Sequence, residues 1–279
     1  MEIKEMLDEL ERKSNTIEKI NTADYVKGGL IYCGKCNTPK QHRIRFNGKT
    51  RVVNCICECE KKRQLEEARE MVQRLKQEGI KMMKRIGFPD PEMEKWTFDA
   101  DDHKNEKIST MARNYVENFG EMKKAGKGLL LYGSVGTGKT FISACIANAL
   151  IEEGRSCLVT NFARLVNTIS GMYDGKQEYI DGLNQFDLLV IDDLASERDT
   201  EYMGEIVQNI IDSRYRSNLP LIITTNLTSD ELKHPSTIRK ERIYSRLFEM
   251  CVPVEVKGSD RRKEKLINNY REFKEMLGI

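Results

Sequence analysis

The chain has 279 residues, of which 46 are Lys or Arg and 44 are Asp or Glu, so its formal charge of +2 excludes a uniformly basic nucleic-acid-binding protein. Hydrophobic residues make up 39% and charged residues 32%, which is typical of a globular protein with charged, helical surfaces. No apolar run approaches the ~20 residues that span a bilayer, and the acidic start does not resemble a signal peptide, so we expect a cytoplasmic protein without membrane contact.

The first third of the chain contains two amphipathic segments. Apolar residues recur at helical spacing among charged ones over residues 3–20 and again over residues 60–86, which predicts a helix in each range. Two prolines follow the second range, and proline disfavours helix in the residue before it. We therefore predict a small, helical N-terminal domain over residues 1–88 and a second domain over residues 89–279.

Five of the eight cysteines lie between the two amphipathic segments, and their spacing predicts a structural zinc site. The candidate ligands are Cys33, Cys36, Cys55, Cys57 and Cys59. Four thiolates can close a tetrahedron around zinc, and a segment this poor in aliphatic residues needs a metal to fold. We expect the first four cysteines to bind, with Cys59 as the first substitute and His42 as a further one. The alternatives are a cluster of reduced thiols, a redox switch or an iron–sulfur cluster.

Short apolar runs alternate with helical stretches in the rest of the chain. The runs that we predict as strands are residues 129–132, 158–160, 188–191, 221–224 and 252–256. This alternation is typical of an α/β domain with a mainly parallel, buried sheet.

A phosphate-binding loop follows the first of these strands. Residues 133–140 match the P-loop motif GxxxxGK[ST], and an apolar helical pattern comes directly after them. Its glycines let backbone N–H groups point at the β-phosphate, and the helix N-terminus adds a partial positive charge. We expect Lys139 to contact the β- and γ-phosphates and Thr140 to bind Mg²⁺. The residues expected to bind ATP are Gly133, Ser134, Val135, Gly136, Thr137, Gly138, Lys139, Thr140 and Phe141.

Polar residues at the ends of two later strands predict the rest of a hydrolytic site. One apolar strand ends in Asp192 and Asp193, and the next ends in Thr-Thr-Asn at Asn226. We assign Asp192 to Mg²⁺, Asp193 to activation of the attacking water, and Asn226 to orientation of that water. Taken alone, an Asp after a strand is also a common helix cap and an Asn a common turn residue.

These motifs, followed by Arg-Ile-Tyr-Ser-Arg-Leu-Phe at residues 242–248, resemble those of AAA+ ATPases. Among these, the chain looks most like the bacterial and phage replicative helicase loaders of the DnaC/DnaI type, which are related to IstB-like helper ATPases of transposition. The resemblance covers about residues 96–265 and implies an AAA+ P-loop NTPase core with a parallel sheet. Only about 23 residues follow the last predicted strand, so the lid is expected to be truncated.

The resemblance also implies roles for individual residues. Asn226 falls at the position called sensor 1, and Arg246 becomes the candidate arginine finger that enters a neighbour's site, which requires self-association. Arg261 or Arg262 falls at the sensor 2 position. The alternative for these arginines is a solvated helix surface.

Two further parts of the chain are implicated by the same resemblance. Relatives insert a helix that lines a path for single-stranded DNA where this chain has Tyr173 and Lys176, a ring for base stacking and a charge for phosphate. The alternative is that Tyr173 packs on the edge of the sheet. The zinc module flanked by helices is similar to the N-terminal helicase-binding domain of the DnaI type.

The sequence therefore predicts a Mg²⁺-dependent ATPase of DNA replication that binds a hexameric replicative helicase and loads it onto single-stranded DNA. ATP, Mg²⁺ and Zn²⁺ are the expected cofactors. One alternative is a transposition helper ATPase that assembles on duplex DNA, although relatives of that kind are not expected to carry the cysteine module. The other is a nucleotide-gated adaptor that binds ATP and scarcely hydrolyses it.

Overall fold

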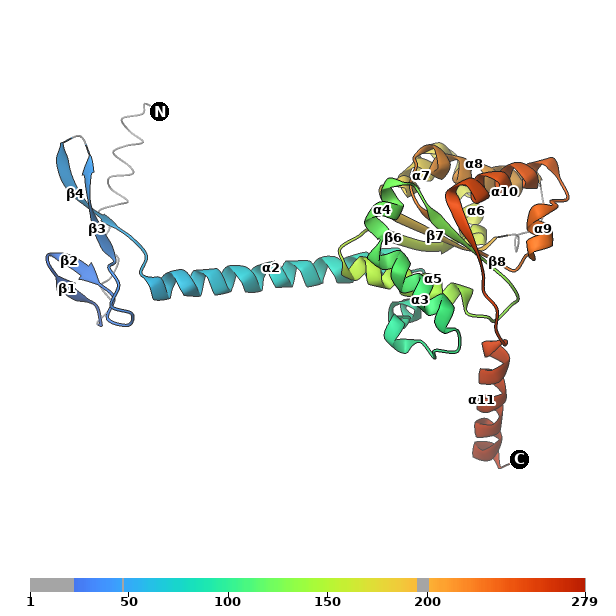
Figure 1. Ribbon diagram of the computed structural model, residues 1–279, viewed down its shortest axis with the longest axis horizontal. Helices are drawn as coiled ribbons and strands as arrows, with labels where there is room; N and C mark the ends of the chain where they lie inside the picture. The colour runs from blue at the N-terminus through green and yellow to red at the C-terminus, as the bar shows by residue number, and fades with distance from the viewer. Residues whose placement is uncertain (1–22, 47, 195–200, 279) are drawn as a thin grey trace. The chain divides into compact units, whose positions relative to one another are not determined.

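The computed structural model describes residues 23–46, 48–194 and 201–278, which belong to two compact units divided between Gln77 and Glu78 (Figure 1). The helix predicted over residues 3–20 lies outside the described residues. The division precedes the break expected at residue 88, because Ile80 and Met83 already pack against the core of the second unit.

The first unit contains two antiparallel hairpins. Strand β1 (Tyr25–Lys27) pairs with β2 (Leu30–Tyr32), and β3 (Gln41–Phe46) pairs with β4 (Lys49–Asn54). The sequence did not predict these hairpins, because strands with mostly exposed side chains show no apolar alternation. Among the described residues of this unit only Cys33 and Cys57 are buried, so the hairpins have almost no apolar core.

Helix α2 (Glu58–Gly87) begins in the first unit and ends in the second. Every residue from 61 to 79 is exposed on this helix. Its last turns, by contrast, pack on the second unit, where Gly87 is buried so tightly that a Cβ would lie 2.5 Å from the carbonyl oxygen of Cys157.

The second unit is built on a five-stranded parallel sheet in the order β6-β7-β8-β5-β9, which confirms the α/β prediction. The strands are β5 (Gly128–Tyr132), β6 (Cys157–Asn161), β7 (Leu188–Leu194), β8 (Leu221–Thr225) and β9 (Cys251–Glu255). Each contains one of the predicted apolar runs or most of it. The three central strands are almost wholly buried, as expected for a sheet covered on both faces.

Helices cover both faces of this sheet, and alternate strand residues enter two separate cores (Figure 1). One face packs on α3 (Glu106–Glu117), α4 (Phe119–Lys124) and α5 (Lys139–Glu152). The other packs on α6 (Phe162–Ser170), α7 (Lys176–Gly182), α8 (Glu201–Arg216), α9 (Ser229–Lys233) and α10 (Ile238–Met250). Short 3₁₀ turns complete the unit at η1 (Pro91–Lys95), η2 (Phe98–Ala100) and η3 (Leu183–Gln185).

Helix α11 (Arg261–Leu277) follows the sheet and is the sole described helix after β9. No helix within the described ranges combines the length and apolar character needed to cross a membrane.

Candidate functional site

The P-loop connects β5 to α5 and depends on glycines for its shape. Gly133, Gly136 and Gly138 have φ angles of 137°, 78° and 96°, a region that strongly favours glycine. A Cβ on Gly133 would lie 2.7 Å from the Val256 carbonyl oxygen, and one on Gly136 would lie 1.9 Å from the Asp260 carboxylate. The segment that leads into α11 therefore packs directly against the P-loop.

Lys139 is buried where the P-loop ends and α5 begins. Its Nζ donates hydrogen bonds of 2.8 Å to each of three oxygens, the carbonyl oxygens of Gly133 and Ser134 and the Oδ1 of Asn226. Burial holds the pKa of Lys139 below its ordinary value. The ammonium group thus lies between the loop and the end of β8, where phosphate oxygens bound by the loop could replace its present acceptors.

Thr140 and Asp192 lie side by side. The Thr140 hydroxyl donates to both carboxylate oxygens of Asp192, at 2.9 and 3.1 Å. Burial raises the pKa of Asp192, and a second hydroxyl, from Thr224, also donates to its carboxylate. One hydroxyl and one carboxylate are hard oxygen donors of the kind that Mg²⁺ prefers, so this pair fits the predicted metal. Nothing in the sequence pattern distinguishes Thr224 beyond its place two residues before Asn226.

Asp193 has a backbone conformation that is unusual for a residue other than glycine. Its φ is 66°, and the β7–β8 register shifts between Ile191 and Leu194. The Asp193 N–H donates to the Thr224 hydroxyl at 2.9 Å, and the Asn226 amide donates to Asp193 Oδ1 at 3.1 Å. The fold therefore brings together the carboxylate and the amide that the sequence assigned to the attacking water; their roles stay predictions.

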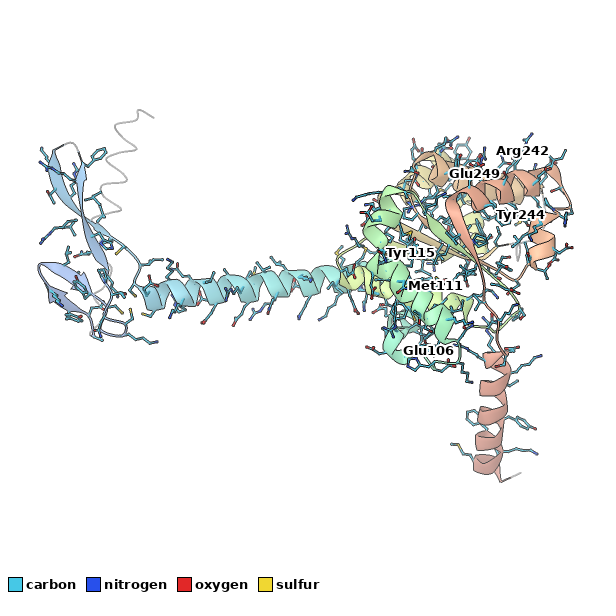
Figure 2. All side chains as sticks on the ribbon, in the orientation of Figure 1. Glu106, Met111, Tyr115, Arg242, Tyr244 and Glu249 are labelled. Atoms are coloured by element: carbon cyan, nitrogen blue, oxygen red, sulfur yellow. The ribbon has the colours of Figure 1, made fainter. Side chains whose placement is uncertain are left out.

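The two candidate arginine positions differ in their surroundings. Arg246 on α10 forms an ion pair with Asp212 on α8, and its neighbour Arg242 is exposed on the same helix (Figure 2). Arg261, by contrast, begins α11, and its N–H donates to the Gly136 carbonyl oxygen at 3.0 Å. Arg261 thus contacts the P-loop within one chain, whereas Arg246 contacts a helix on the other side of the sheet from α5.

Lys176 is the first residue of α7, and Tyr173 lies in the loop that precedes this helix. The Tyr173 side chain is 96% exposed, so it does not pack on the edge of the sheet. The Lys176 ammonium donates to the Tyr202 hydroxyl at 3.1 Å and lies 5.6 Å from the centre of that ring.

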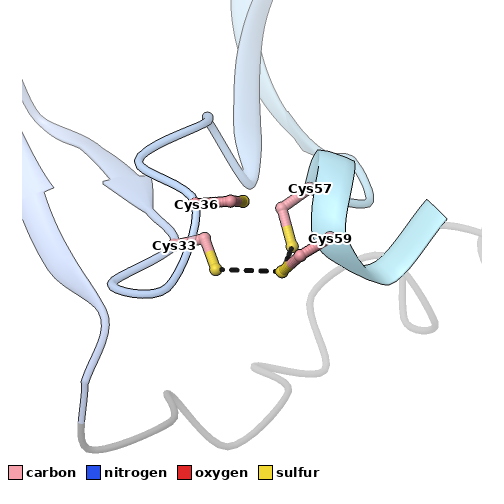
Figure 3. A group of neighbouring side chains, drawn as sticks. All are labelled: Cys33, Cys36, Cys57 and Cys59. Carbon is pink, nitrogen blue, oxygen red and sulfur yellow. Dashed lines mark hydrogen bonds between the residues drawn. The ribbon is translucent and has the colours of Figure 1, made fainter. Parts of the chain in front are cut away.

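Four cysteines in the first unit converge, and they are not the four that the sequence favoured. The Sγ atoms of Cys33, Cys36, Cys57 and Cys59, the four-cysteine cluster, all lie within 4.8 Å of one another (Figure 3). Cys55 instead follows β4 directly, its N–H pairs with the Lys40 carbonyl oxygen, and its thiol donates to the Pro39 carbonyl oxygen.

The physical reason for this correction is a change of direction in the chain. The backbone pairing that β4 begins continues through Cys55, and α2 then begins at Glu58, so that Cys57 and Cys59 flank the start of the helix. His42, the further substitute, is exposed on β3 and is not part of the cluster.

The sulfurs of the four-cysteine cluster influence one another's protonation. The Thr38 hydroxyl lowers the pKa of Cys36 to about 5, whereas hydrogen bonds from neighbouring thiols, Cys57 first, raise the pKa of Cys59 to about 12. Four thiolates at this spacing repel one another unless a cation lies among them. The donor set is therefore compatible with a structural zinc site.

Residues 57–268 match the family described as IstB-like ATP binding protein. The chain is 28% identical over 161 residues to the replicative helicase loader DnaI of Bacillus subtilis (strain 168), an alignment that covers 53% of this chain and 51% of that protein. It is 28% identical over 141 residues to the replicative helicase loader DnaC of Escherichia coli (strain K12), covering 49% and 55% of the two chains. The chain thus spans about half the length of the curated relatives it matches.

Solved structures of DnaI and DnaC have a fold similar to that of this chain. A crystal structure of DnaI superposes with a TM-score of 0.53 at 26% identity, covering 64% of this chain and 98% of that one. A crystal structure of the DnaC helicase loader superposes with a TM-score of 0.53 at 24% identity, covering 60% of this chain and 100% of that one.

Proposed function

We propose that this chain, which belongs to the family of IstB-like ATP binding proteins, is an ATP-dependent loader of a replicative DNA helicase. The observation that carries the ATP-dependent part of the proposal is the convergence of Lys139, Asp192 and Asn226 beside the P-loop. The names of two relatives, both replicative helicase loaders, support the same function.

The hydrolytic step would use the side chains at the ends of β7 and β8. Lys139 exchanges its carbonyl acceptors for phosphate oxygens, and Asp193 accepts the proton of the attacking water while Asn226 orients that water. Thr140 and Asp192 would hold Mg²⁺, which would neutralise charge on the β- and γ-phosphates. Every one of these groups comes from a single chain.

Efficient hydrolysis also requires a neighbouring subunit under this proposal. Arg246 would leave Asp212 and enter the nucleotide site of the next copy, where its planar guanidinium stabilises charge that develops on the γ-phosphate. An isolated monomer is therefore expected to be a poor ATPase.

The first unit is proposed to bind the helicase through α2. Zn²⁺ held by the four-cysteine cluster would stabilise the start of this helix, which otherwise adjoins almost no core. Beyond the cluster, Leu65, Ala68, Val72 and Leu75 recur at spacings of three and four residues, and all are exposed. An exposed apolar stripe on a helix is a common docking surface for a groove or a partner helix.

Single-stranded DNA is the second proposed partner. Tyr173 presents an almost fully exposed ring and Lys176 a nearby charge, the combination that binds strands without reading their sequence. A different candidate is a transposition helper ATPase on duplex DNA, the role that the sequence resemblance to IstB-like proteins implies; the match to the IstB-like ATP binding family is compatible with it.

The test is ATP hydrolysis by the purified protein, alone and with a hexameric replicative helicase plus either single-stranded or duplex DNA. We expect strong stimulation by helicase with single-stranded DNA, and its loss in Lys139→Ala and Asp193→Asn. Stimulation by duplex DNA without a helicase complex would instead favour the transposition helper. An Asp193→Asn protein that still loads helicase would favour the adaptor.

The α2 surface has its own matched test. Val72→Glu places a charge in the apolar stripe and is expected to abolish co-purification with the helicase. Gln77→Glu adds the same charge at an exposed position on the opposite face of the helix and should leave the complex intact. Equal effects of the two substitutions would count against this surface.

A further inference from the structure

Arg261 lies against the part of the P-loop that cradles phosphate. Its N–H is bound to the Gly136 carbonyl oxygen, and a Cβ built on Gly138 would lie 3.2 Å from its Nη1 and 3.3 Å from its Cζ. Gly138 directly precedes Lys139, and the backbone N–H groups at this turn are the ones that bind phosphate in a P-loop. The guanidinium is therefore a neighbour of any phosphate held there.

This guanidinium already has an anionic partner. Arg261 Nη1 lies 3.2 Å from Asp102 Oδ1, and the two side chains are 25% and 38% exposed. Burial is the main cause of the lowered pKa of Lys139, and the positive charge of Arg262, the residue after Arg261, lowers it further. Asp102 thus places a negative charge beside the Arg261 guanidinium at the candidate nucleotide site.

The carboxylate of Asp102 is held in place by its own loop. Its Oδ1 accepts the Lys104 N–H at 3.1 Å, and the Asn105 side-chain amide donates to the Lys257 carbonyl oxygen at 2.7 Å. One residue earlier, the buried Asp101 accepts a hydrogen bond from the Ser109 hydroxyl on α3. A fixed carboxylate facing a long, partly exposed arginine means that the arginine is the group that can change partner.

From this geometry we propose that Asp102 is a positioning residue that limits the affinity of the site for nucleoside triphosphate by competing with phosphate for Arg261. The inference rests on the proposed nucleotide binding and deepens it. A partly exposed ion pair of this kind alters binding by up to about five-fold. The triphosphate carries more charge than the diphosphate and gains more from contact with the guanidinium, so competition by Asp102 lowers the affinity for ATP more than the affinity for ADP.

The test measures dissociation constants of ATP and ADP for the full chain by calorimetry in the presence of Mg²⁺. Asp102→Asn keeps an acceptor for the Lys104 N–H but removes the charge, and we expect it to tighten ATP binding about two- to five-fold and ADP binding less. Asp102→Glu should restore the wild-type values. Asp99→Asn, an exposed carboxylate in the same stretch, is the control and should change neither constant.

The decisive measurement repeats Asp102→Asn in an Arg261→Gln background. There we expect no further effect, because the competing guanidinium is gone. An equal tightening in both backgrounds, no effect in the wild-type background, or weaker ATP binding by Asp102→Asn would each overturn the inference while leaving the proposed function standing. A wild-type protein that binds neither nucleotide would overturn the proposed function itself. Thermal unfolding of each variant verifies that it is folded.

Discussion

Thr224 connects the two aspartates of the candidate hydrolytic site, although it has no catalytic role of its own. Its hydroxyl donates to the partly buried Asp192 carboxylate and accepts the N–H of Asp193, whose positive φ turns that residue toward Asn226. A single hydroxyl thus helps to orient both the candidate Mg²⁺ ligand and the candidate water-activating group.

We expect Thr224→Val to weaken Mg²⁺ binding, so that helicase-stimulated ATP hydrolysis needs a Mg²⁺ concentration about 10- to 100-fold higher for half its maximal rate. This is about the effect of losing a group that orients a metal ligand. Thr224→Ser retains the hydroxyl and should behave nearly as wild type. A Mg²⁺ titration of the hydrolysis rate distinguishes them, and identical titrations for the two variants would contradict this role.

Arg214 is an example of a charged residue with a structural function. It is 1% exposed on α8, and its guanidinium donates to the carbonyl oxygens of Phe186, Asp187 and Pro220. Burial lowers its pKa to about 10.

Because Arg214→Met would leave these carbonyl groups without a partner, we expect a loss of about 3 kcal/mol in the free energy of unfolding. Arg216→Met, exposed at the end of the same helix, should cost less than about 0.5 kcal/mol. Urea denaturation of the two variants measures the difference, and a small, equal change in both would refute the structural role.

At the scale of elements, the junction between β4 and α2 decides which cysteines converge. Backbone pairing retains Cys55 beside Lys40, whereas the first turn of α2 carries Cys59 toward Cys33, with their Sγ atoms 3.5 Å apart. The same junction links the cysteines to the helix that bears the proposed helicase-binding stripe.

We therefore expect Cys59→Ser to lose bound zinc and Cys55→Ser to retain one equivalent, as measured by metal analysis of the purified proteins. Removal of zinc with a chelator should unfold the hairpins, which lack an apolar core, and abolish helicase binding. The opposite pattern for the two cysteines would restore the ligand set favoured by the sequence.

At the scale of the whole molecule, the proposed sharing of one hydrolytic site by two copies of the chain can be tested by mixing two inactive variants. Arg246→Ala supplies an intact P-loop but no finger, and Lys139→Ala supplies a finger but no functional P-loop. If Arg246 acts in the neighbouring site, each variant alone should be at least tenfold less active than wild type, and their mixture should regain part of the activity. A mixture no more active than its components would show that Arg246 does not act between subunits.

Much of the fold was predictable because its signals are contiguous. The five apolar runs predicted the five strands of the parallel sheet, and the P-loop residues appear in the required order between a strand and a helix. The approach of Asp192, Asp193 and Asn226 also followed from the sequence, since parallel strands that are neighbours in a sheet end at the same edge. The exposed hairpins were missed because short polar strands have no apolar period.

What the sequence alone determined about this protein is its α/β class, its nucleotide-binding loop and the short list of groups around it, because residues close in the chain or at equivalent strand ends specify them. Only the tertiary structure decided the choice of Cys59 over Cys55, the pairing of Asp102 with Arg261, and the burial of Arg214. Each of these depends on two segments meeting after separate turns of the chain. In the sequence these cysteines, acids and arginines look like others of their kind, because packing rather than local spacing determines their partners.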